Sequence, residues 1–535
     1  MDGTTTRRGA ILGSAAAAVA LAAPSLSRAQ RGGADPRVLR FVPQATLSNP
    51  DPVSSLAGVS VNHGFYVFDT LFGVDSQLRA RPQMAEGHTV SDDGLTWTIR
   101  LREGLFFHDG EPVRARDCAA SLRRWSNRDT FGRTLGAALA EWQAPDDRTL
   151  VARLQRPFPL LVDALAKPGT VPAFVMPERL AATDALRPLP EIVGSGPYRF
   201  VADEFVSGSR AVYAKFDRYA PRQEQPEWTA GGKVVNFERV EWRMLPDQAT
   251  AAAALQSGEV DWWEHAAADL IPLLRRSRDI AIANGDPAGY MGVLRFNHLH
   301  PPFDKPAARR AVLAAVEQPD FMAAVTNSDQ SAYRVCHSFF PCGTPYGRAP
   351  SPSPMEGASL DRARALLRES GYAGERVTLL NPSDFPSIAP LGLIANDLLT
   401  RIGFNVDFVT TDWGTVAARV INKGAPTQGG WNLYPVWWSG MGIVTPTQNA
   451  LIRGQGAGGW SGWYESAEME ALNGRWLAAA GDGERLRVGA AMQDLAFRDV
   501  PTVPLGQFFI RTAYRRSLTG VLEGPRPVPW NVRRV

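Results

Sequence analysis

Apolar residues recur at helical spacing in several segments of this chain, and each of these runs is followed by a glycine and then by a short strand pattern. The longest run consists of Ile388, Leu391, Ile394, Leu398 and Ile402. Gly403 is placed to end this predicted helix, and Val406 and Phe408 then alternate with polar residues as in a strand.

The same order appears twice more. A helix is predicted over 249–257, with Gly258 as its stop and 260–262 as the next strand. Another is predicted over 359–370, with Ser359 or Asp361 as its N-cap and Gly371 as its terminator. Repeated helix–glycine–strand units are typical of α/β lobes, so we predict an α/β protein.

Residues 95–107 follow a different pattern, because apolar and charged side chains alternate for most of the segment. This period predicts an antiparallel strand or hairpin with one solvated face, which stops at the turn 108–112. Boundaries between parts of the chain are predicted near 72–74, 194–198, 285–289 and 501–504.

The length and composition restrict the class of protein. A chain of 535 residues is too long for a single hydrophobic core, so two or three lobes are expected. The composition, 44% hydrophobic and 21% charged, is that of a globular protein. The formal net charge is only +3, which gives no electrostatic argument for binding nucleic acid.

The N-terminus has the pattern of an export signal. Arg7 and Arg8 precede an apolar run of 14 residues, 10–23, which is too short to span a bilayer. Small residues at 27–29 offer a cleavage site. The paired arginines resemble a Tat-type signal, although Ala10 stands where that signal usually has phenylalanine. We predict a Tat-like signal peptide at 1–29 and a soluble periplasmic protein; a disordered basic tail is the alternative.

Two of the three cysteines are close in sequence. Cys336 and Cys342 lie six residues apart in a loop bounded by proline and glycine, and export favours a disulfide between them. Two free thiols are the second interpretation. A metal site that includes His337 is the third, but it lacks the usual four ligands. Cys118 falls in a helical pattern and is expected to be buried.

Signatures of catalysis are missing from the sequence. It has no G-x-S-x-G, H-E-x-x-H or P-loop motif, and no G-x-G-x-x-G after a strand pattern. His298 and His300 are the nearest to a pair of metal ligands, and polar loop histidines are the simpler interpretation. No catalytic residue, metal or cofactor is therefore predicted.

Residues 82–125 resemble the signature region of periplasmic extracellular solute-binding proteins of the peptide/nickel ABC importer family, which includes dipeptide- and oligopeptide-binding proteins. The matching features are the Asp-Asp-Gly turn at 92–94, Leu-Arg-x-Gly at 101–104, Phe-His-Asp-Gly at 107–110 and Ala-x-Asp at 115–117. Later segments match in the family's order: GSGPYRF at 194–200, ALQSGEVD at 254–261, FNHLHPPF at 296–303, ARALLRESGY at 363–372, IGFNVDF at 402–408 and PTVPLGQ at 501–507.

The resemblance implies an α/β fold of two lobes that close like a clamp about a hinge, with an extra N-terminal subdomain. The expected parts are lobe one (30–70, 194–285 and 501–535), a hairpin-containing subdomain (71–193) and lobe two (286–500). A small organic solute, peptide-like or other, would lie between the lobes, and the closed form would deliver it to an ABC permease in the inner membrane. A monomer is expected.

Two other functions stay open at this point. The same clamp could report its ligand to a chemoreceptor or a sensor kinase, and the sequence does not separate this role from transport. An exported cofactor-dependent enzyme is the alternative of another class, and only the Tat-like signal suggests it.

The segment GGWNLYPVWWSG, 429–440, contains Trp431, Tyr434, Trp437 and Trp438. These rings could be ordinary core or could line a ligand cleft, and the resemblance implies a strand that enters the cleft from lobe two. Neighbouring residues of a strand point to opposite faces, so we expect one ring of the Trp437–Trp438 pair in the core and the other against ligand. Pro435 is expected to disturb this alternation.

Peptide-binding members of the family have an aspartate just after this strand, which pairs with the ammonium group of the peptide. Read against Trp438 and Ser439, that position is Met441 in this chain. A buried ammonium group without a counter-charge is costly, so ordinary peptides are disfavoured unless another acid replaces the missing one. Asp412 and Asp69 are the candidates.

The remaining contacts are expected from other segments. Trp413 follows the preceding strand, and Asn62, His63 and Tyr66 lie where the family's first lobe meets the cleft. The predicted ligand contacts are therefore Trp431, Tyr434, Trp437, Trp438, Ser439, Met441, Trp413, Asn62, His63 and Tyr66.

Overall fold

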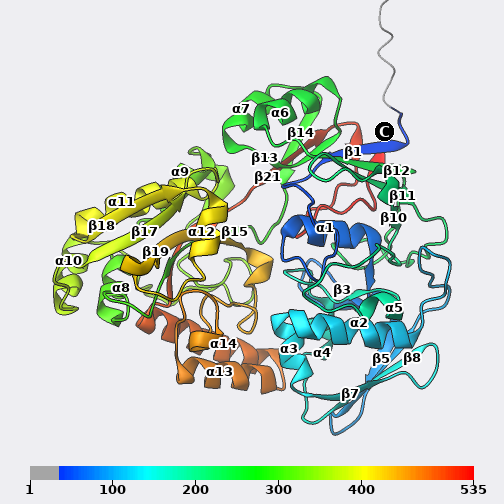
Figure 1. Cartoon of the computed structure of the whole chain (residues 1–535), viewed down its shortest axis with the longest axis horizontal. Coiled ribbons are helices and arrows are strands. Elements are labelled where there is room, and N and C mark those ends of the chain that lie inside the picture. The colour runs from blue at the N-terminus through cyan, green and yellow to red at the C-terminus, as the bar shows by residue number, and fades with distance from the viewer. Residues whose placement is uncertain (1–34) are drawn as a thin grey trace, which may run out of the picture. The chain divides into compact units, whose positions relative to one another are not determined.

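The structure is a computed structural model, and it describes residues 35–535 (Figure 1). The predicted signal peptide lies outside these residues. Residues 36–535 form one unit, in which we distinguish three parts by their sheets. None of the helices in the described part of the chain is long and apolar enough to cross a membrane.

The first sheet, which defines lobe one, has seven strands. In spatial order they are β10 (Tyr198–Phe200), β11 (Arg210–Lys215), β12 (Arg239–Arg243), β1 (Val38–Val42), β13 (Trp262–Ala266), β21 (Arg511–Arg515) and β14 (Ile280–Asn284). The central strand β1 pairs in parallel with β12 and β13, and the other pairs are antiparallel. The helices of this lobe are α1 (Gly58–Val67), α6 (Gln248–Ser257) and α7 (Ile271–Arg275).

The second sheet, which defines lobe two, has six strands. In spatial order they are β16 (Tyr333–Arg334), β20 (Thr502–Phe508), β15 (Tyr290–Phe296), β19 (Leu433–Ser439), β17 (Arg376–Pro382) and β18 (Asn405–Thr411). The helices of this lobe are α8 (Pro306–Leu313), α9 (Gln318–Thr326), α10 (Leu360–Glu369), α11 (Ala389–Ile402), α12 (Trp413–Arg419), α13 (Ala467–Ala478) and α14 (Asp482–Asp499).

A third part, the subdomain, is inserted between α1 and β10. Its four-stranded antiparallel sheet has the order β5 (Ala85–Val90), β6 (Thr96–Leu101), β8 (Thr149–Leu154) and β7 (Leu139–Gln143). Its helices are α2 (Ala115–Arg128), α3 (Thr130–Gly136), α4 (Leu161–Ala166) and α5 (Glu178–Ala181). Short strand pairs complete it and the C-terminus: β2 (Asp69–Thr70) with β9 (Phe174–Val175), β3 (Phe72–Val74) with β4 (Ala80–Pro82), and β22 (Leu518–Thr519) with β23 (Arg533–Arg534).

Two antiparallel chain segments join the lobes. The chain leaves lobe one after β14 and enters lobe two at β15, and it returns from β20 to β21. β14 pairs with β21 in one sheet, and β15 pairs with β20 in the other. Between the sheets, the Gln507 side chain donates to the carbonyl of Ala288 over 2.7 Å. A two-stranded connection of this kind is suited to bending, because few residues need to change their dihedral angles.

The structure confirms several helix ends that local sequence patterns predicted. α11 ends at Gly403 and α6 ends at Gly258, and both glycines have left-handed backbones, with φ of 115° and 81°. Ser359, and not Asp361, caps α10, because its hydroxyl accepts from the backbone N–H of Arg362 over 3.2 Å. Glycine is favoured after a helix because the left-handed conformation clashes with a Cβ atom.

Two expectations are wrong. Residues 501–535 do not all belong to lobe one, because β20 is buried along its whole length and pairs with β15 and β16 of lobe two. Pro435 does not disturb the alternation of β19, whose pairing with β15 runs without a shift from Leu433 to Ser439. β19 meets β17 only at Leu433, so the strand edge beside Pro435 has no partner there that needs an N–H donor.

Of the three interpretations of the cysteine pair, the structure agrees with the disulfide. Cys336 and Cys342 form a disulfide, and Cys118 is a buried free thiol. Within residues 35–535 no group of three or more His, Cys, Asp or Glu side chains is arranged to hold a metal ion. His298 and His300 instead meet the backbone carbonyls of Pro501 and Lys423 over 3.0 and 2.9 Å.

Candidate ligand-binding cleft

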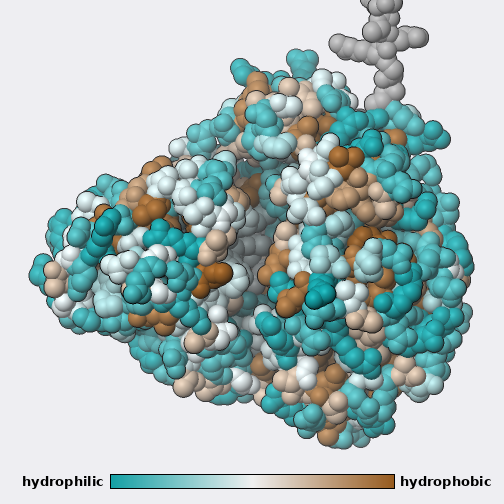
Figure 2. All heavy atoms as spheres, in the orientation of Figure 1, coloured by the Kyte–Doolittle hydropathy of each residue, from teal (hydrophilic) through white to brown (hydrophobic). Residues whose placement is uncertain are grey.

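The first cavity lies between lobe one and lobe two, and its volume is about 540 Å³. Lobe one contributes Gln44, which follows β1, and His265, which lies near the end of β13. Lobe two contributes Ser387, Trp437 and Phe508. The space-filling view shows a hollow between the lobes (Figure 2). A cavity of this size at the carboxyl ends of strands is suited to a small organic ligand.

The second cavity, of about 600 Å³, lies between the subdomain and lobe two. The subdomain contributes the end of α2, the start of α3 and the loop 167–171. Lobe two contributes Trp438, Met441 and parts of the segment 447–460. The loop 167–171 packs closely on the segment that follows β19, since a Cβ atom on Gly169 would lie 3.1 Å from the carbonyl oxygen of Met441.

The two neighbouring tryptophans of β19 face different cavities. Trp437 lines the first cavity, where its ring packs edge-on against Tyr290 at 4.8 Å and its Nε1 donates to the Ser387 hydroxyl over 2.9 Å. Trp438 lines the second cavity, where its ring packs edge-on against Trp460 at 4.9 Å. The alternation of an extended strand places the two rings on opposite sides.

Two buried carboxyl groups lie beside the first cavity. Glu264, on β13, and Asp286, in the crossover to lobe two, are each 6% exposed and line a small recess that shares His265 with the first cavity. Within the described residues, neither has a Lys or Arg nitrogen within 4.0 Å. Glu264 accepts from the backbone N–H of Gln44 and from Asn62, each over 2.7 Å.

Burial dominates the titration of both acids. It raises the pKa of Glu264 to about 7, against the hydrogen bonds from Gln44 and Asn62. It raises the pKa of Asp286 to about 6, against the backbone N–H of Ala288, the charge of Arg526 and the Ser439 hydroxyl. The charge of Arg526 lowers both pKa values, but burial outweighs it, because no cation pairs with either carboxylate within 4.0 Å in the described residues.

Arg526 enters this region from the C-terminal segment. It donates to the carbonyl of Pro168 over 3.1 Å and to the Asn62 side chain over 3.3 Å. Burial lowers its pKa, while Tyr290, Asp286 and Glu264 raise it. We call Glu264, Asp286 and Arg526 the cleft charge group.

His265 completes the surroundings of the cleft charge group as a neutral residue. Its Nε2 lies 3.2 Å from the hydroxyl of Tyr290 and 3.8 Å from Glu264. Burial first, and the charge of Arg526 second, lower the pKa of His265 to about 4. At neutral pH the ring therefore adds no positive charge that could neutralise Glu264.

Four of the predicted contacts lie in the core. Trp431 is fully buried and donates to the carbonyl of Val420 over 3.1 Å, and Tyr434 packs edge-on against it at 5.0 Å. His63 lies 2.9 Å from the hydroxyl of Tyr213, and Tyr66 packs on Trp242, both inside lobe one. These four side chains are not accessible to a ligand in this conformation, and they line neither cavity.

The other predicted contacts have mixed positions. Asn62 is buried behind the cleft charge group and links Glu264 to Arg526. The Ser439 hydroxyl lowers the pKa of Asp286, and Met441, which is 3% exposed, lines the second cavity. Trp413 packs against Phe385 at 5.6 Å; Phe385 lines the first cavity, and Trp413 does not.

The two acids expected to replace the missing aspartate are placed elsewhere. Asp412 is exposed and caps α12 through the N–H of Thr415, over 2.9 Å. Asp69 is buried and forms an ion pair with Lys233 over 2.7 Å. Neither lines a cavity of the cleft, so the expectation of an anchor at these residues is wrong.

Sequence reasoning missed Glu264, Asp286 and Arg526. A signal existed for Glu264, because it follows the apolar residues of β13 at the carboxyl end of a strand. Asp286 stands between two strands in the predicted boundary 285–289, which is a hinge position. No local pattern marks Arg526, which lies among prolines near the C-terminus.

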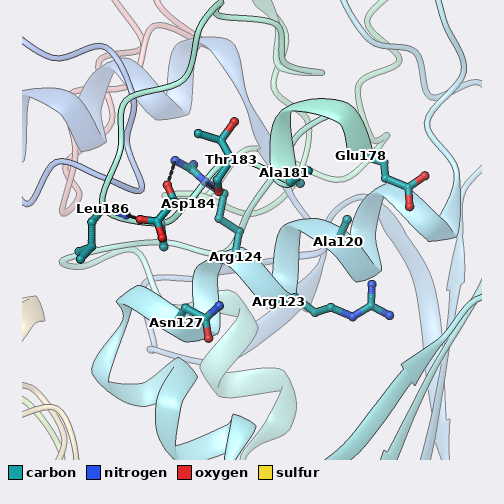
Figure 3. Close-up of a pocket in the computed structure, with 11 residues that line it drawn as sticks. Ala120, Arg123, Arg124, Asn127, Glu178, Ala181, Thr183, Asp184 and Leu186 are labelled. Atoms are coloured by element: carbon teal, nitrogen blue, oxygen red, sulfur yellow. Dashed lines mark hydrogen bonds between the residues drawn. The ribbon is translucent and has the colours of Figure 1, made fainter.

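A third cavity, of about 550 Å³, lies in the subdomain between α2 and the segment 178–186 (Figure 3). Arg124 lines this cavity, but its side chain already has partners within the protein. It forms an ion pair with Asp51 over 2.7 Å. It also donates to the carbonyls of Thr183 and Asp184 (Figure 3). Arg124 therefore has a structural role in the wall of this cavity.

Known proteins resemble this chain over nearly its whole length. Residues 79–460 match the family model "Bacterial extracellular solute-binding proteins, family 5 Middle". A probable peptide ABC transporter periplasmic-binding protein of Sinorhizobium fredii is 34% identical over 540 residues, which cover 99% of this chain and 100% of the relative. A glutathione-binding protein of Escherichia coli K12 is 26% identical over 487 residues, which cover 89% of each chain.

A solved structure has the same fold. The periplasmic binding protein from A. tumefaciens R10 in complex with agropinic acid superposes with a TM-score of 0.77, at 22% identity, over 93% of this chain and 99% of that one. The chain belongs to family 5 of the bacterial extracellular solute-binding proteins. This confirms the predicted family, its periplasmic-binding-protein fold and its role as the solute-binding component of an ABC importer, which is not an enzyme.

Proposed function

We propose that this protein captures a peptide-like solute with a free ammonium group in the first cavity and delivers it to an ABC permease. The supporting observation is the pair of buried carboxyl groups, Glu264 and Asp286, that have no cationic partner within 4.0 Å in the described residues. A bound ammonium group would supply the missing charge.

The electrostatic argument has two sides. An ionised carboxylate that is buried without a partner is destabilised, which is why the pKa values of Glu264 and Asp286 are raised. An ammonium group that leaves water also needs a nearby negative charge. When the two meet in one closed cleft, each compensates the desolvation of the other, so binding is selective for solutes with a positive charge at this point.

The other walls of the cavity fit the rest of such a solute. Trp437 and Phe508 offer apolar surface for a side chain. Arg526 also lines the recess, and its guanidinium group is a partner for a carboxylate. The relatives support this class, because their names describe binding of peptides and of glutathione.

Met441, in place of an aspartate, made ordinary peptides a disfavoured ligand. The cleft charge group removes this objection, because it provides acids from other positions. Met441 lines the second cavity and not the first, so its apolar side chain leaves the first cavity unaffected. Asp286 interacts with Ser439. Ser439 is the last residue of β19, the strand that precedes Met441. We infer that Asp286, from the hinge crossover, takes the role that other members give to an acid after the strand.

A thermal-shift panel tests this function. Di- and tripeptides with free amino groups should raise the melting temperature, since a ligand at 100 times its Kd adds about 2.7 kcal/mol of stability. The matched N-acetylated peptides should have no effect at the same concentrations. A shift with both sets, or with neither, contradicts the proposed role of the ammonium group.

The export route and the oligomeric state belong to this proposal as well. We infer export through the Tat pathway from Arg7 and Arg8, and a monomeric receptor whose lobes close about the connection between β14–β15 and β20–β21. Replacing both arginines by lysine should keep the precursor in the cytoplasm. Normal export of that variant would contradict the route, and a dimer mass in light scattering would contradict the monomer.

A further inference from the structure

Basic side chains gather in the second cavity. Its walls contain five of them, Arg128, Arg133, Arg156, Lys167 and Arg453, with Asp129 as the one acid in the described lining. Two of these cations are already neutralised. Arg453 pairs with Glu470, and Lys167 pairs with Asp129 over 2.6 Å.

The acid Asp129 uses both of its carboxylate oxygens within the fold. One oxygen meets Lys167, and the other caps α3 by accepting from the backbone N–H of Gly132 over 2.9 Å. Arg128 directly precedes Asp129 at the end of α2, but no ion pair joins the two in the described structure. The acid therefore holds the fold of this corner together and leaves the neighbouring arginines unpaired.

Three guanidinium groups consequently remain without an acidic partner within 4.0 Å among the described residues: Arg128, Arg133 and Arg156. The Nε atom of Arg128 is buried and has no hydrogen-bond acceptor there. Burial first, and the charge of Arg133 second, lower the pKa of Arg128, and the smaller effect of Asp129 opposes them. The two arginine cations therefore repel each other. An unsatisfied buried donor and repelling cations both cost stability, and an anion would remove both costs.

We propose that the second cavity is a binding site for an oxyanion group, a phosphate or a carboxylate, held by Arg128, Arg133 and Arg156. Planar guanidinium groups match the oxygens of such anions with paired hydrogen bonds, which a spherical halide cannot use. This site is separate from the first cavity, because the loop 167–171 packs on Met441 between Arg526 and the three arginines.

Two sources could supply the same group. The oxyanion could be a free small anion, or it could be an acidic group of a long solute whose other end lies beside the cleft charge group. Titration calorimetry with inorganic phosphate, at ionic strength kept constant with chloride, separates them. Phosphate binding that is unchanged in protein saturated with an amino peptide indicates a free anion. Competition between phosphate and an acidic peptide indicates the solute's own group.

The variants test the residues. Arg128→Gln/Arg133→Gln should weaken phosphate binding by about tenfold or more, because each charge-assisted hydrogen bond is worth more than a factor of ten. Arg116→Gln is the matched control: this residue lies on the same helix, is 58% exposed and lines neither cavity. It should bind phosphate as the wild type does. Arg133→Gln alone, at an exposed position, keeps the test valid if the double variant does not fold.

Three results would overturn the proposal. They are equal effects of phosphate and chloride on the wild type, equal losses in Arg116→Gln and in the double variant, and wild-type affinity in the folded double variant. None of these measurements depends on an ammonium group in the first cavity, so a failure of the proposed function would be distinguished from a failure of this site.

Discussion

Trp437 and Trp438 follow one another on β19, yet their rings line two different cavities, one between the lobes and one between the subdomain and lobe two. The strand continues through Pro435 without a register shift, so the alternation is intact where it reaches the cleft. The ring of Trp437 packs edge-on against Tyr290 and Phe385, and the ring of Trp438 packs edge-on against Trp460. The pair therefore separates two possible binding sites physically.

The first prediction concerns these rings. Trp437→Ala should weaken binding of the best amino peptide by about tenfold, because an aromatic contact is worth about 1 kcal/mol beyond its burial. Trp438→Ala should leave peptide affinity within about twofold. Calorimetry measures both. Since Trp437 also donates to Ser387, Trp437→Phe is the control that retains ring packing but not the hydrogen bond. Equal losses of affinity in both alanine variants would contradict the separation.

The second prediction concerns the charge of the acids. Asp286→Asn and Glu264→Gln each remove one negative charge and keep nearly the same volume. We expect each variant to bind amino peptides at least tenfold more weakly, because a buried ammonium group then faces one charge fewer. Asp412→Asn, at an exposed helix cap, is the control and should bind normally. Unchanged affinity in both cleft variants would exclude an ammonium group at this place.

The third prediction concerns the stability of the ligand-free protein. Burial raises the pKa of Glu264 from 4.5 to about 7, so the folded state holds this proton more tightly than the unfolded state does. Its contribution to stability is then complete below the ordinary pKa and is lost as the pH rises through about 7. The total lost is about 3 kcal/mol.

Other buried groups also titrate, so this contribution is read from a difference. Burial lowers the pKa values of His63 and His265 to about 3 and about 4. At low pH these two histidines therefore have the opposite effect on stability, because their contribution is lost as the pH falls. Urea unfolding of the wild type and of Glu264→Gln between pH 4.5 and pH 8 isolates the acid. As the pH rises, the free energy of unfolding of the variant should increase relative to that of the wild type. Parallel curves would contradict the raised pKa.

The fourth prediction concerns the disulfide. Cys336 and Cys342 close a loop with a sequence separation of 6. Loss of the bond in Cys336→Ser/Cys342→Ser should lower the free energy of unfolding by about 2 kcal/mol, from the entropy of the opened loop. A reductant should destabilise the wild type by a similar amount and leave the double variant unchanged. Insensitivity of the wild type to complete reduction would show that the bond does not stabilise the fold.

Much of the fold was accessible from the sequence because its signals are local. The glycines at 258 and 403 end helices through their own backbone conformation, and Cys336 reaches Cys342 within one loop. Membership of β20 in lobe two depends on pairing with β15, more than 200 residues earlier, and its apolar sequence fits either sheet equally well. Local patterns do not contain that information.

The site was less accessible for the same reason. Arg526 reaches Asn62 across 464 residues of sequence, and Asn62 reaches Glu264 across 202. Of the four rings in 429–440, those of Trp437 and Trp438 line cavities, and the other two lie in the core. The acids that we propose in place of the expected aspartate come from a different strand and from the hinge, where no motif of the peptide binders would direct attention.

The most direct test of the central claim is a count of protons released on binding. Calorimetry of the tightest amino peptide at pH 6.5, in buffers of different ionisation enthalpy, gives this count. Glu264 and Asp286, with pKa values of about 7 and about 6, are then partly protonated, and an arriving ammonium group must displace their protons. The account predicts proton release in the wild type, its loss in Glu264→Gln/Asp286→Asn, and weaker affinity below about pH 6. Binding without proton release, with the same affinity at pH 5 and pH 8, would contradict it.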